Sequence, residues 1–145
     1  WPTSAGEAEL DERIAEAEQA GDLDTVNRLE TRYWLDGADQ RDGRVKGAPR
    51  TLFTTMNRQA LGAPAVGDAA AHPPIWPRLG EIGCPVLVVA GEHDLPGIVR
   101  QCEDLADALP DAAYTRIDAA AHCPSLDQPA ALAAAVTGFA SRVTG

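Results

Sequence analysis

Apolar residues in the first third of the chain recur at the spacing of α-helices. Two sets are separated by intervals of three and four residues, namely Leu10, Ile14 and Ala17, then Val26, Leu29 and Tyr33. Such spacing places each set on one face of a helix. Gly21 separates the two sets, and Asp22 or Asp24 is suited to cap the second helix. The pattern therefore predicts an antiparallel helical hairpin that ends near Asp36 and Gly37.

A third helix is predicted after the polar connection of residues 37–47. Pro49 suits the first turn of a helix, and the apolar residues that follow it at helical spacing are Leu52, Phe53, Met56 and Leu61. From Gly62 to Pro77 the composition shifts to Ala, Gly and Pro, which discourages regular structure. We therefore expect a helical subdomain over residues 1–77, whose last part, residues 63–77, is a linker.

Residues 78–145 have a different pattern, in which short apolar runs alternate with helical spacing. Residues 85–90 are rich in Val and typical of a strand buried on both faces of a parallel sheet. A helix is predicted from Pro96, a weaker strand over 113–117, a loop over 118–127 and a last helix from Pro129. The stripe of that helix is Leu132, Val136, Phe139 and Val143. The order predicts an α/β fold with a right-handed crossover between parallel strands.

Side chains that suit acid–base chemistry follow both predicted strands. Asp94 comes four residues after Ala90, and His122 comes five residues after Ile117. Neighbouring parallel strands lie about 4.8 Å apart and end at the same edge of a sheet. A carboxylate at that edge can orient an imidazole and stabilise its charged form. Asp94 and His122 are therefore the candidate catalytic residues, with Asp94 as the orienting acid and His122 as the base.

Both residues also have simpler interpretations. Asp94 precedes Leu95 and Pro96, so it is also suited to cap the helix that begins there. His122 alone is compatible with a loop histidine whose hydrogen bonds are satisfied. His72 and His93 are expected to face solvent or to pack against neighbours.

The 145 residues offer no evident nucleophile for this pair. The three serines are Ser4, Ser125 and Ser141, and none lies in the G-x-S-x-G sequence of a nucleophile elbow. Cys123 directly follows His122, which is a poor placement for an aligned attack. We expect Cys123 to be a packed small thiol.

The charge of the chain argues against some classes of binding partner, and its cysteines indicate the compartment in which it resides. The chain has 22 acidic and 12 basic residues, a net charge of -10, and its basic residues are scattered singly. Nucleic acid and anionic membranes attract basic patches, so neither is an expected partner. Cys84, Cys102 and Cys123 include no C-x-x-C pair, and at least two occupy apolar positions. We therefore expect reduced thiols in a cytoplasmic protein, with no metal site and no cofactor.

The two segments that carry the candidate pair resemble the carboxyl-terminal end of an α/β-hydrolase. They are residues 78–96, which include Gly91-Glu92-His93-Asp94-Leu95-Pro96, and residues 119–129, which include His122-Cys123-Pro124. They are most similar to the branch of esterases, cofactor-free haloperoxidases and carbon–carbon bond hydrolases. In that family the aspartate of G-x-x-D-x-P is the triad acid, and the histidine before P-x-L-x-x-P is the general base. These two residues match Asp94 and His122. Residues 1–77 are similar, less specifically, to the helical lid that such enzymes insert before their last two strands.

The resemblance implies cofactor-free hydrolysis of a small, mostly apolar ester or related substrate. It also implies that the first strands and the nucleophile lie outside these residues, so the isolated chain is expected to be inactive. The alternative is a non-catalytic binding or interaction protein derived from a truncated hydrolase, a homo-oligomer or a chain that pairs through an open strand edge. The larger apolar side chains of the lid are expected to be core residues between its helices and not walls of a substrate pocket. They are Tyr33, Trp34, Phe53 and Met56.

Overall fold

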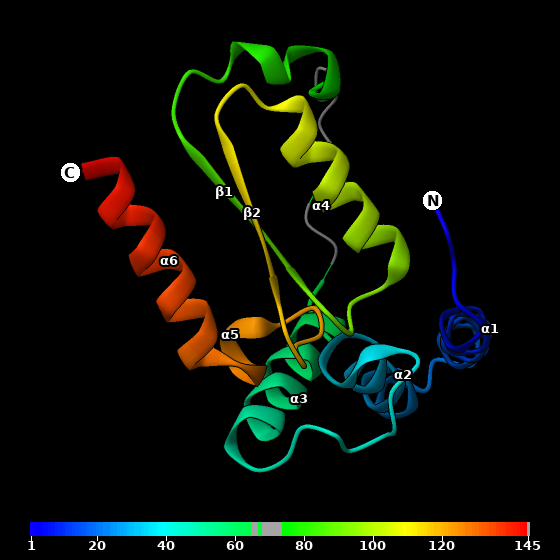
Figure 1. Ribbon diagram of the computed structural model, residues 1–145. Helices are drawn as coiled ribbons and strands as arrows, with labels where there is room; N and C mark the ends of the chain where they lie inside the picture. Colours follow the sequence, from blue (N-terminus) through cyan, green and yellow to red (C-terminus); the bar gives the residue numbers. More distant parts are fainter. Residues whose placement is uncertain (65–66, 68–73, 145) are drawn as a thin grey trace.

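A group of helices and a smaller α/β unit follow one another along the chain, as Figure 1 shows. The computed structural model describes residues 1–64, 67 and 74–144. The first group contains α1 (Ala5–Gln19), α2 (Leu23–Glu30), the π-helix η1 (Thr31–Gly37) and α3 (Ala48–Leu61). The second contains the 3-10 helix η2 (Trp76–Glu81), β1 (Val86–Gly91), α4 (Pro96–Ala108), β2 (Ala112–Ile117), α5 (Pro124–Asp127) and α6 (Pro129–Thr144).

The predicted helical hairpin is present, and short polar residues cap both of its helices. The Ser4 hydroxyl accepts the Glu7 N–H at 3.1 Å while the Glu7 carboxylate accepts the Ser4 N–H at 3.3 Å, which is a capping box. Of the two proposed caps for α2, Asp22 takes the role by accepting the Thr25 N–H at 3.0 Å. Leu10 and Leu29 pack in one buried cluster, so the two apolar faces meet as the spacing predicts.

The second helix does not continue as an α-helix to Gly37. From Thr31 onward the turns widen into η1, and the Thr31 hydroxyl donates to the Asn27 carbonyl at 2.6 Å. π-Helical turns are rare and frequently occur at functional sites. η1 ends at Gly37, whose φ of 93° is in the left-handed region that favours glycine.

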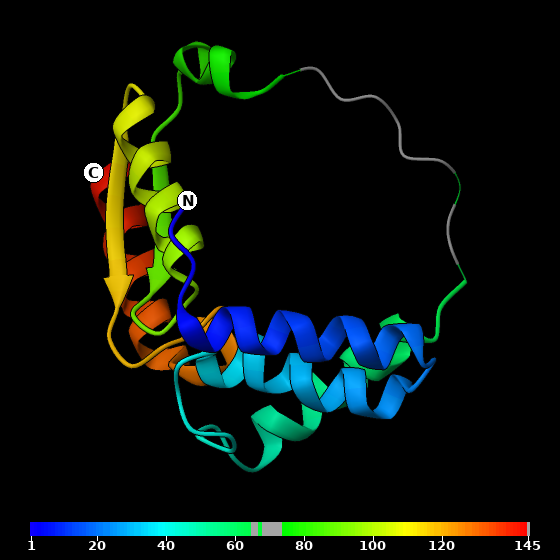
Figure 2. The ribbon, with the colours of Figure 1, turned by 90° about the vertical axis from the view of Figure 1, so that its right-hand side faces the viewer.

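β1 and β2 form the parallel pair that the sequence predicts. The register runs from Val86 opposite Ala112 to Gly91 opposite Ile117. Figure 1 shows α4 on one side of the two strands and α6 on the other. Figure 2 shows that the strands run toward the helical group, so their carboxyl ends face α1 to α3. Any side chain placed just after either strand therefore lies beside these helices.

Several details of the second part differ from the sequence-based expectations. β1 is not buried on both faces, because only Val88, Ala90 and Gly91 are buried and the rest of the strand is half-buried. Residues 118–127 are not all loop, because α5 occupies the last four. The cysteines are also less buried than expected: Cys84 is exposed, and Cys102 and Cys123 are half-buried.

The burial differences have a common physical cause. In the described part of the chain the sheet has two strands, so each strand is paired along one edge alone. The apolar stripe of α6 accordingly remains open, with Val136 50% and Val143 47% exposed. A strand reaches full burial when neighbouring strands and covering helices surround it.

The predicted division into a lid of residues 1–77 and a core of residues 78–145 remains a prediction. Most of the expected linker, residues 63–77, lies outside the described residues. At its end the chain is more regular than predicted, because η2 already begins at Trp76. Among the helices of the described residues, none has the length and apolar character needed to cross a lipid bilayer.

Candidate active site

Asp94 and His122 meet at the carboxyl ends of β1 and β2. The Nδ1 atom of His122 lies 3.0 Å from Oδ2 and 3.2 Å from Oδ1 of Asp94. The Asp94 side chain is 5% exposed, whereas that of His122 is 43% exposed. The structure thus brings together the two residues that the sequence singles out, with the carboxylate buried and the imidazole accessible.

The turn after β1 places Asp94. The His93 N–H donates to the Ala120 carbonyl at 2.7 Å, and the Glu92 N–H donates to the Ile117 carbonyl at 2.9 Å. These bonds join the turn to the chain that follows β2, so both strand ends approach closely. The Asp94 carboxylate accepts the adjacent Leu95 N–H at 2.8 Å, a local bond that coexists with the contact to His122.

η1 holds His122 from the other side. The backbone N–H of His122 donates to the Trp34 carbonyl at 3.1 Å. The Trp34 and His122 rings lie 4.8 Å apart between centroids, and the Tyr33 ring meets Trp34 edge-on at 4.6 Å. The expectation that Tyr33 is a core residue is confirmed, since it is buried in the cluster with Leu10. Trp34 has a second role, as a wall beside the imidazole.

The electrostatic surroundings of His122 favour its protonated form. The hydrogen bond that His122 donates to Asp94 raises the pKa of His122 above its ordinary value, partial burial opposes this rise, and the charge of Asp94 adds to it. Burial, together with Asp94 and Asp127, raises the pKa of the neighbouring Cys123 thiol. Since a thiol attacks as its thiolate, this shift makes Cys123 a weak nucleophile.

Two of the three serines make hydrogen bonds within or at the start of their own helices, and the third is exposed. Ser4 caps α1, the Ser141 hydroxyl donates to the Thr137 carbonyl at 3.0 Å on α6, and Ser125 is an exposed residue of α5. None of the hydrogen bonds found among the described residues joins a serine or cysteine to His122. Asp94 binds Nδ1, so Nε2 is the ring nitrogen that remains for proton transfer.

An apolar cavity of about 440 Å³ adjoins the His122 loop between α3 and α5. Its walls are Phe53, Met56, Asn57, Ala60, Cys123, Ser125 and Leu126. Met56 is 60% exposed and Phe53 is half-buried, so the expectation that both serve mainly as lid core is wrong for Met56. Met56 instead lines the cavity. Asn57, on the same cavity wall, ties α3 to α2 by donating to Glu30 and Asn27 at 2.6 and 3.1 Å.

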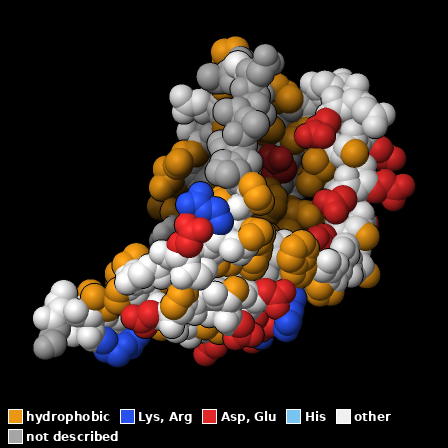
Figure 3. Space-filling view, turned by 90° about the horizontal axis from the view of Figure 1, so that it is seen from above, with side chains coloured by type: hydrophobic (Ala, Val, Ile, Leu, Met, Phe, Trp, Pro, Cys, Tyr) orange, Lys and Arg blue, Asp and Glu red, His pale blue; other side chains and the backbone are white. Residues whose placement is uncertain are grey.

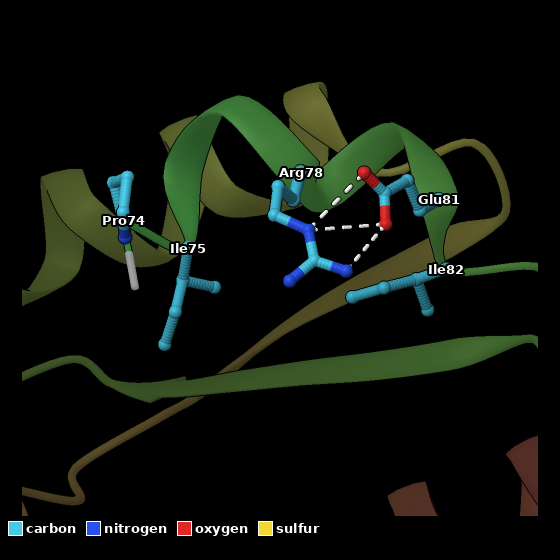
Figure 4. A pocket seen from close by; sticks show the side chains of 5 residues that line it. All are labelled: Pro74, Ile75, Arg78, Glu81 and Ile82. Carbon is cyan, nitrogen blue, oxygen red and sulfur yellow. Dashed lines mark hydrogen bonds and ion pairs between the residues drawn. The ribbon is translucent and has the colours of Figure 1, made fainter. Parts of the chain in front are cut away.

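A second hollow lies at the far end of the strands from the Asp94–His122 pair. It measures about 310 Å³ and is lined by Pro74, Ile75, Arg78, Glu81 and Ile82 (Figure 4). The Arg78 guanidinium is already paired with Glu81 at 2.8 Å, so this hollow presents little free charge. It takes no part in the candidate active site.

Three charged residues that the sequence did not identify organise the surroundings of the pair. They are Asp36, Arg44 and Asp127. Arg44 and Asp127 are 83 positions apart, so no local pattern reveals their contact. From the sequence, Asp36 marks only the end of a helix. No group of three metal-binding side chains is found within residues 1–64, 67 and 74–144.

No protein-family model matches the chain, and no curated protein does either. Among solved structures, the chain is similar to MenH from S. aureus, with a TM-score of 0.64 and 22% sequence identity. The match covers 99% of this chain and 57% of MenH, so the chain spans little more than half the length of that protein. The chain therefore has part of an α/β-hydrolase fold, as the resemblance of its two motif segments implies.

Proposed function

We propose that this chain is the lid and carboxyl-terminal part of an α/β-hydrolase, and that Asp94 and His122 are its triad acid and general base. The observation that carries the proposal is the 3.0 Å contact between His122 Nδ1 and Asp94 Oδ2 where two adjacent parallel strands end. A buried carboxylate on Nδ1 fixes the imidazole tautomer and leaves Nε2 to accept a proton.

The proposed chemistry needs a nucleophile at Nε2. His122 takes the proton of a hydroxyl or thiol as it attacks the substrate carbonyl, and Asp94 stabilises the imidazolium that forms. His122 then gives this proton to the leaving alcohol. Water, deprotonated by His122 in the same way, releases the acid and restores the nucleophile. No step requires a cofactor.

We propose that the nucleophile comes from a segment outside these 145 residues. In support, the chain has no G-x-S-x-G sequence, and the Cys123 thiol has a raised pKa. The partial coverage of MenH is also consistent with a larger catalytic unit. A Ser hydroxyl or a Cys thiol fits the proton transfer described above, whereas with an Asp nucleophile His122 would deprotonate the hydrolytic water alone.

The proposed substrate is a small, mostly apolar ester or a related acyl compound. Support comes from the cavity of about 440 Å³, whose apolar walls Phe53, Met56 and Leu126 stand next to the His122 loop. A cavity of this volume is within the range of small-molecule sites.

The proposal includes a reducing compartment such as the cytoplasm and no nucleic-acid partner. Cys84, Cys102 and Cys123 are all free thiols in the structure. On the face drawn in Figure 3, acidic side chains are interspersed with apolar ones, and Lys and Arg do not gather into a patch.

The first test measures the acid–base pair directly. We expect Asp94→Asn to lower the pKa of His122, because the variant removes the negative charge, weakens the hydrogen bond that raises this pKa and leaves the opposing effect of burial. An NMR titration of the imidazole protons measures this. Asp118→Asn, an equal change of charge at an exposed residue of the same loop, is the control. A His122 pKa that is unaffected by Asp94→Asn would contradict the proposed pair.

The second test measures turnover of an activated ester such as p-nitrophenyl butyrate. The isolated chain is expected to be inactive, and turnover that Cys123→Ser abolishes would show that the nucleophile is Cys123. In the longer polypeptide or complex that contains the nucleophile, we expect Asp94→Asn to reduce kcat by about 10⁴-fold. A loss smaller than tenfold would remove Asp94 from the triad.

A second candidate function is non-catalytic interaction with another chain through the open sheet. The exposed stripe of α6 favours it, since Val136 and Val143 are about half exposed at 50% and 47%. β1 and β2 each have one unpaired edge in the described part of the chain. Unpaired strand edges and apolar surface promote association.

A further inference from the structure

The guanidinium of Arg44 joins two segments that both contact His122. Its Nε donates to the Asp36 carbonyl at 2.7 Å and its Nη2 to the Leu35 carbonyl at 3.0 Å, both at the end of η1. On the other side, Nη1 donates to the Ala119 carbonyl at 2.6 Å. The two terminal nitrogens also donate to the Asp127 carboxylate, Nη2 to Oδ2 at 2.5 Å and Nη1 to Oδ1 at 3.1 Å. These contacts use all five N–H donors of an arginine.

Asp127 also binds Ala121, the residue directly before His122. Besides Arg44, its Oδ2 atom accepts the Ala121 N–H at 2.9 Å. The Asp127 side chain is 3% exposed and that of Arg44 16% exposed, so solvent screens the pair weakly. The loop is thus held at Ala119 and Ala121, on the amino-terminal side of His122. Ala119 itself has a φ of 56°, a left-handed conformation that needs such support.

The geometry points to Arg44 as a positioning residue that aligns His122 with Asp94 by locking η1 against the loop of residues 118–127. This inference rests on the proposed function, because it assigns a role toward the proposed base. η1 supplies the Trp34 carbonyl and ring that contact His122, so Arg44 binds both structures between which the imidazole is held. Arg44 does not touch the imidazole and acts through these segments.

Arg44→Lys tests this role while keeping the charge. A lysine ammonium has no planar fork and cannot replace contacts to four residues on two segments. Nitrogen-15 NMR of the imidazole in the complete 145-residue chain reports which ring nitrogen carries the proton. In the native chain we expect Nδ1–H, donated to Asp94. In Arg44→Lys we expect part of the population to shift from the Nδ1–H tautomer to the Nε2–H tautomer, and the His122 pKa to be lower.

A direct effect of charge has the opposite sign. The titratable groups around His122 are Asp94 on the turn after β1, Cys123 and Asp127 on its own loop, and Arg44 facing that loop. Arg44→Met removes a positive charge and leaves Asp127 unpaired, which by charge alone raises the His122 pKa. Loss of alignment lowers it. A rise in Arg44→Met with no change of tautomer in Arg44→Lys would overturn the inference.

Arg50→Lys is the matched control. Arg50 also makes a buried ion pair, at 2.7 Å to Asp36, and a second one to Asp42 at 2.9 Å, but neither partner belongs to the loop of residues 118–127. We expect this variant to lose stability without changing the His122 tautomer. An equal change of tautomer in both variants would reduce Arg44 to a structural role. If Arg44→Lys does not fold, Asp127→Asn provides the same measurement, because it weakens the fork while keeping an acceptor for Ala121.

The same spectra separate this inference from the proposed function. If the native chain shows no Nδ1–H form, or if Asp94→Asn leaves it unchanged, the proposed acid–base pair itself fails. If the pair is present and Arg44→Lys does not affect it, the role of Arg44 alone fails.

Discussion

At the scale of single residues, the site depends on how closely two strand ends approach. Gly91 is the last residue of β1, and a Cβ atom there would lie 2.6 Å from the Ala120 carbonyl oxygen and overlap the Ala121 carbonyl oxygen. Only glycine permits this approach, which allows the His93 N–H to reach Ala120 at 2.7 Å. The missing side chain at Gly91 therefore sets the distance at which Asp94 and His122 meet.

We expect Gly91→Ala to destabilise the fold by about 1–3 kcal/mol, because backbone atoms must move apart to admit the methyl group. Urea unfolding followed by circular dichroism measures the change. Gly83→Ala is the control, since a Cβ there meets no atom within 4 Å and its φ is not in the left-handed region. Equal stability of the two variants would show that the close approach at Gly91 is not needed.

At the scale of elements, η1 and the connection to α3 are organised around one buried carboxylate. Asp36 is fully buried, and it accepts the N–H groups of Gly43 and Val45 at 2.8 and 2.9 Å and the Arg50 guanidinium at 2.7 Å. The turn-rich connection of residues 37–47 thus satisfies its backbone by folding around a side chain of η1. This places Arg44 in reach of the His122 loop.

We expect Asp36→Ala to cost about 3–5 kcal/mol, because it leaves a partly buried guanidinium and two N–H groups without their acceptor. Asp42→Ala is the control: it removes another carboxylate from the same Arg50, but that side chain is 51% exposed. Its loss should cost less than about 1 kcal/mol. Thermal unfolding of the two variants under identical conditions compares them, and similar melting temperatures would argue against the organising role of Asp36.

At the scale of the whole molecule, helices cover both faces of a sheet that has two strands in the described part of the chain. α4 and α6 flank β1 and β2, and the helical group lies at the carboxyl ends of the strands (Figures 1 and 2). The α6 stripe leaves Val136 and Val143 exposed on this framework. Apolar surface of this kind favours association with another chain.

We expect the mean mass of the isolated chain to rise above 15.3 kDa as concentration increases. The double variant Val136→Lys, Val143→Lys should reduce this rise, because it places charge on the exposed stripe. Static light scattering measures both, and Thr51→Lys, Thr55→Lys on exposed positions of α3 controls for added charge. A native chain that stays monomeric throughout the concentration series would count against the interaction candidate.

Elements supported by local signals were predictable from the sequence. The cap at Asp22, the proline starts of α4 and α6 and the Val-rich β1 all depend on neighbours within a few residues. The π-helical turns of η1 were not, because the apolar spacing through Tyr33 is also compatible with an α-helix. Nor was the exposure of Met56, which depends on how α3 packs against elements distant in the sequence.

What the sequence by itself determined is the order of helices and strands, and with it the location of Asp94 and His122 after two parallel strands. Periodicity, capping and the shared edge of a parallel sheet require no knowledge of distant contacts. The tertiary structure alone decided that Nδ1 faces Asp94, that Trp34 borders the imidazole and that Arg44 binds Asp127. These contacts join residues from 28 to 88 positions apart, and they form because buried polar groups must find partners once the segments pack.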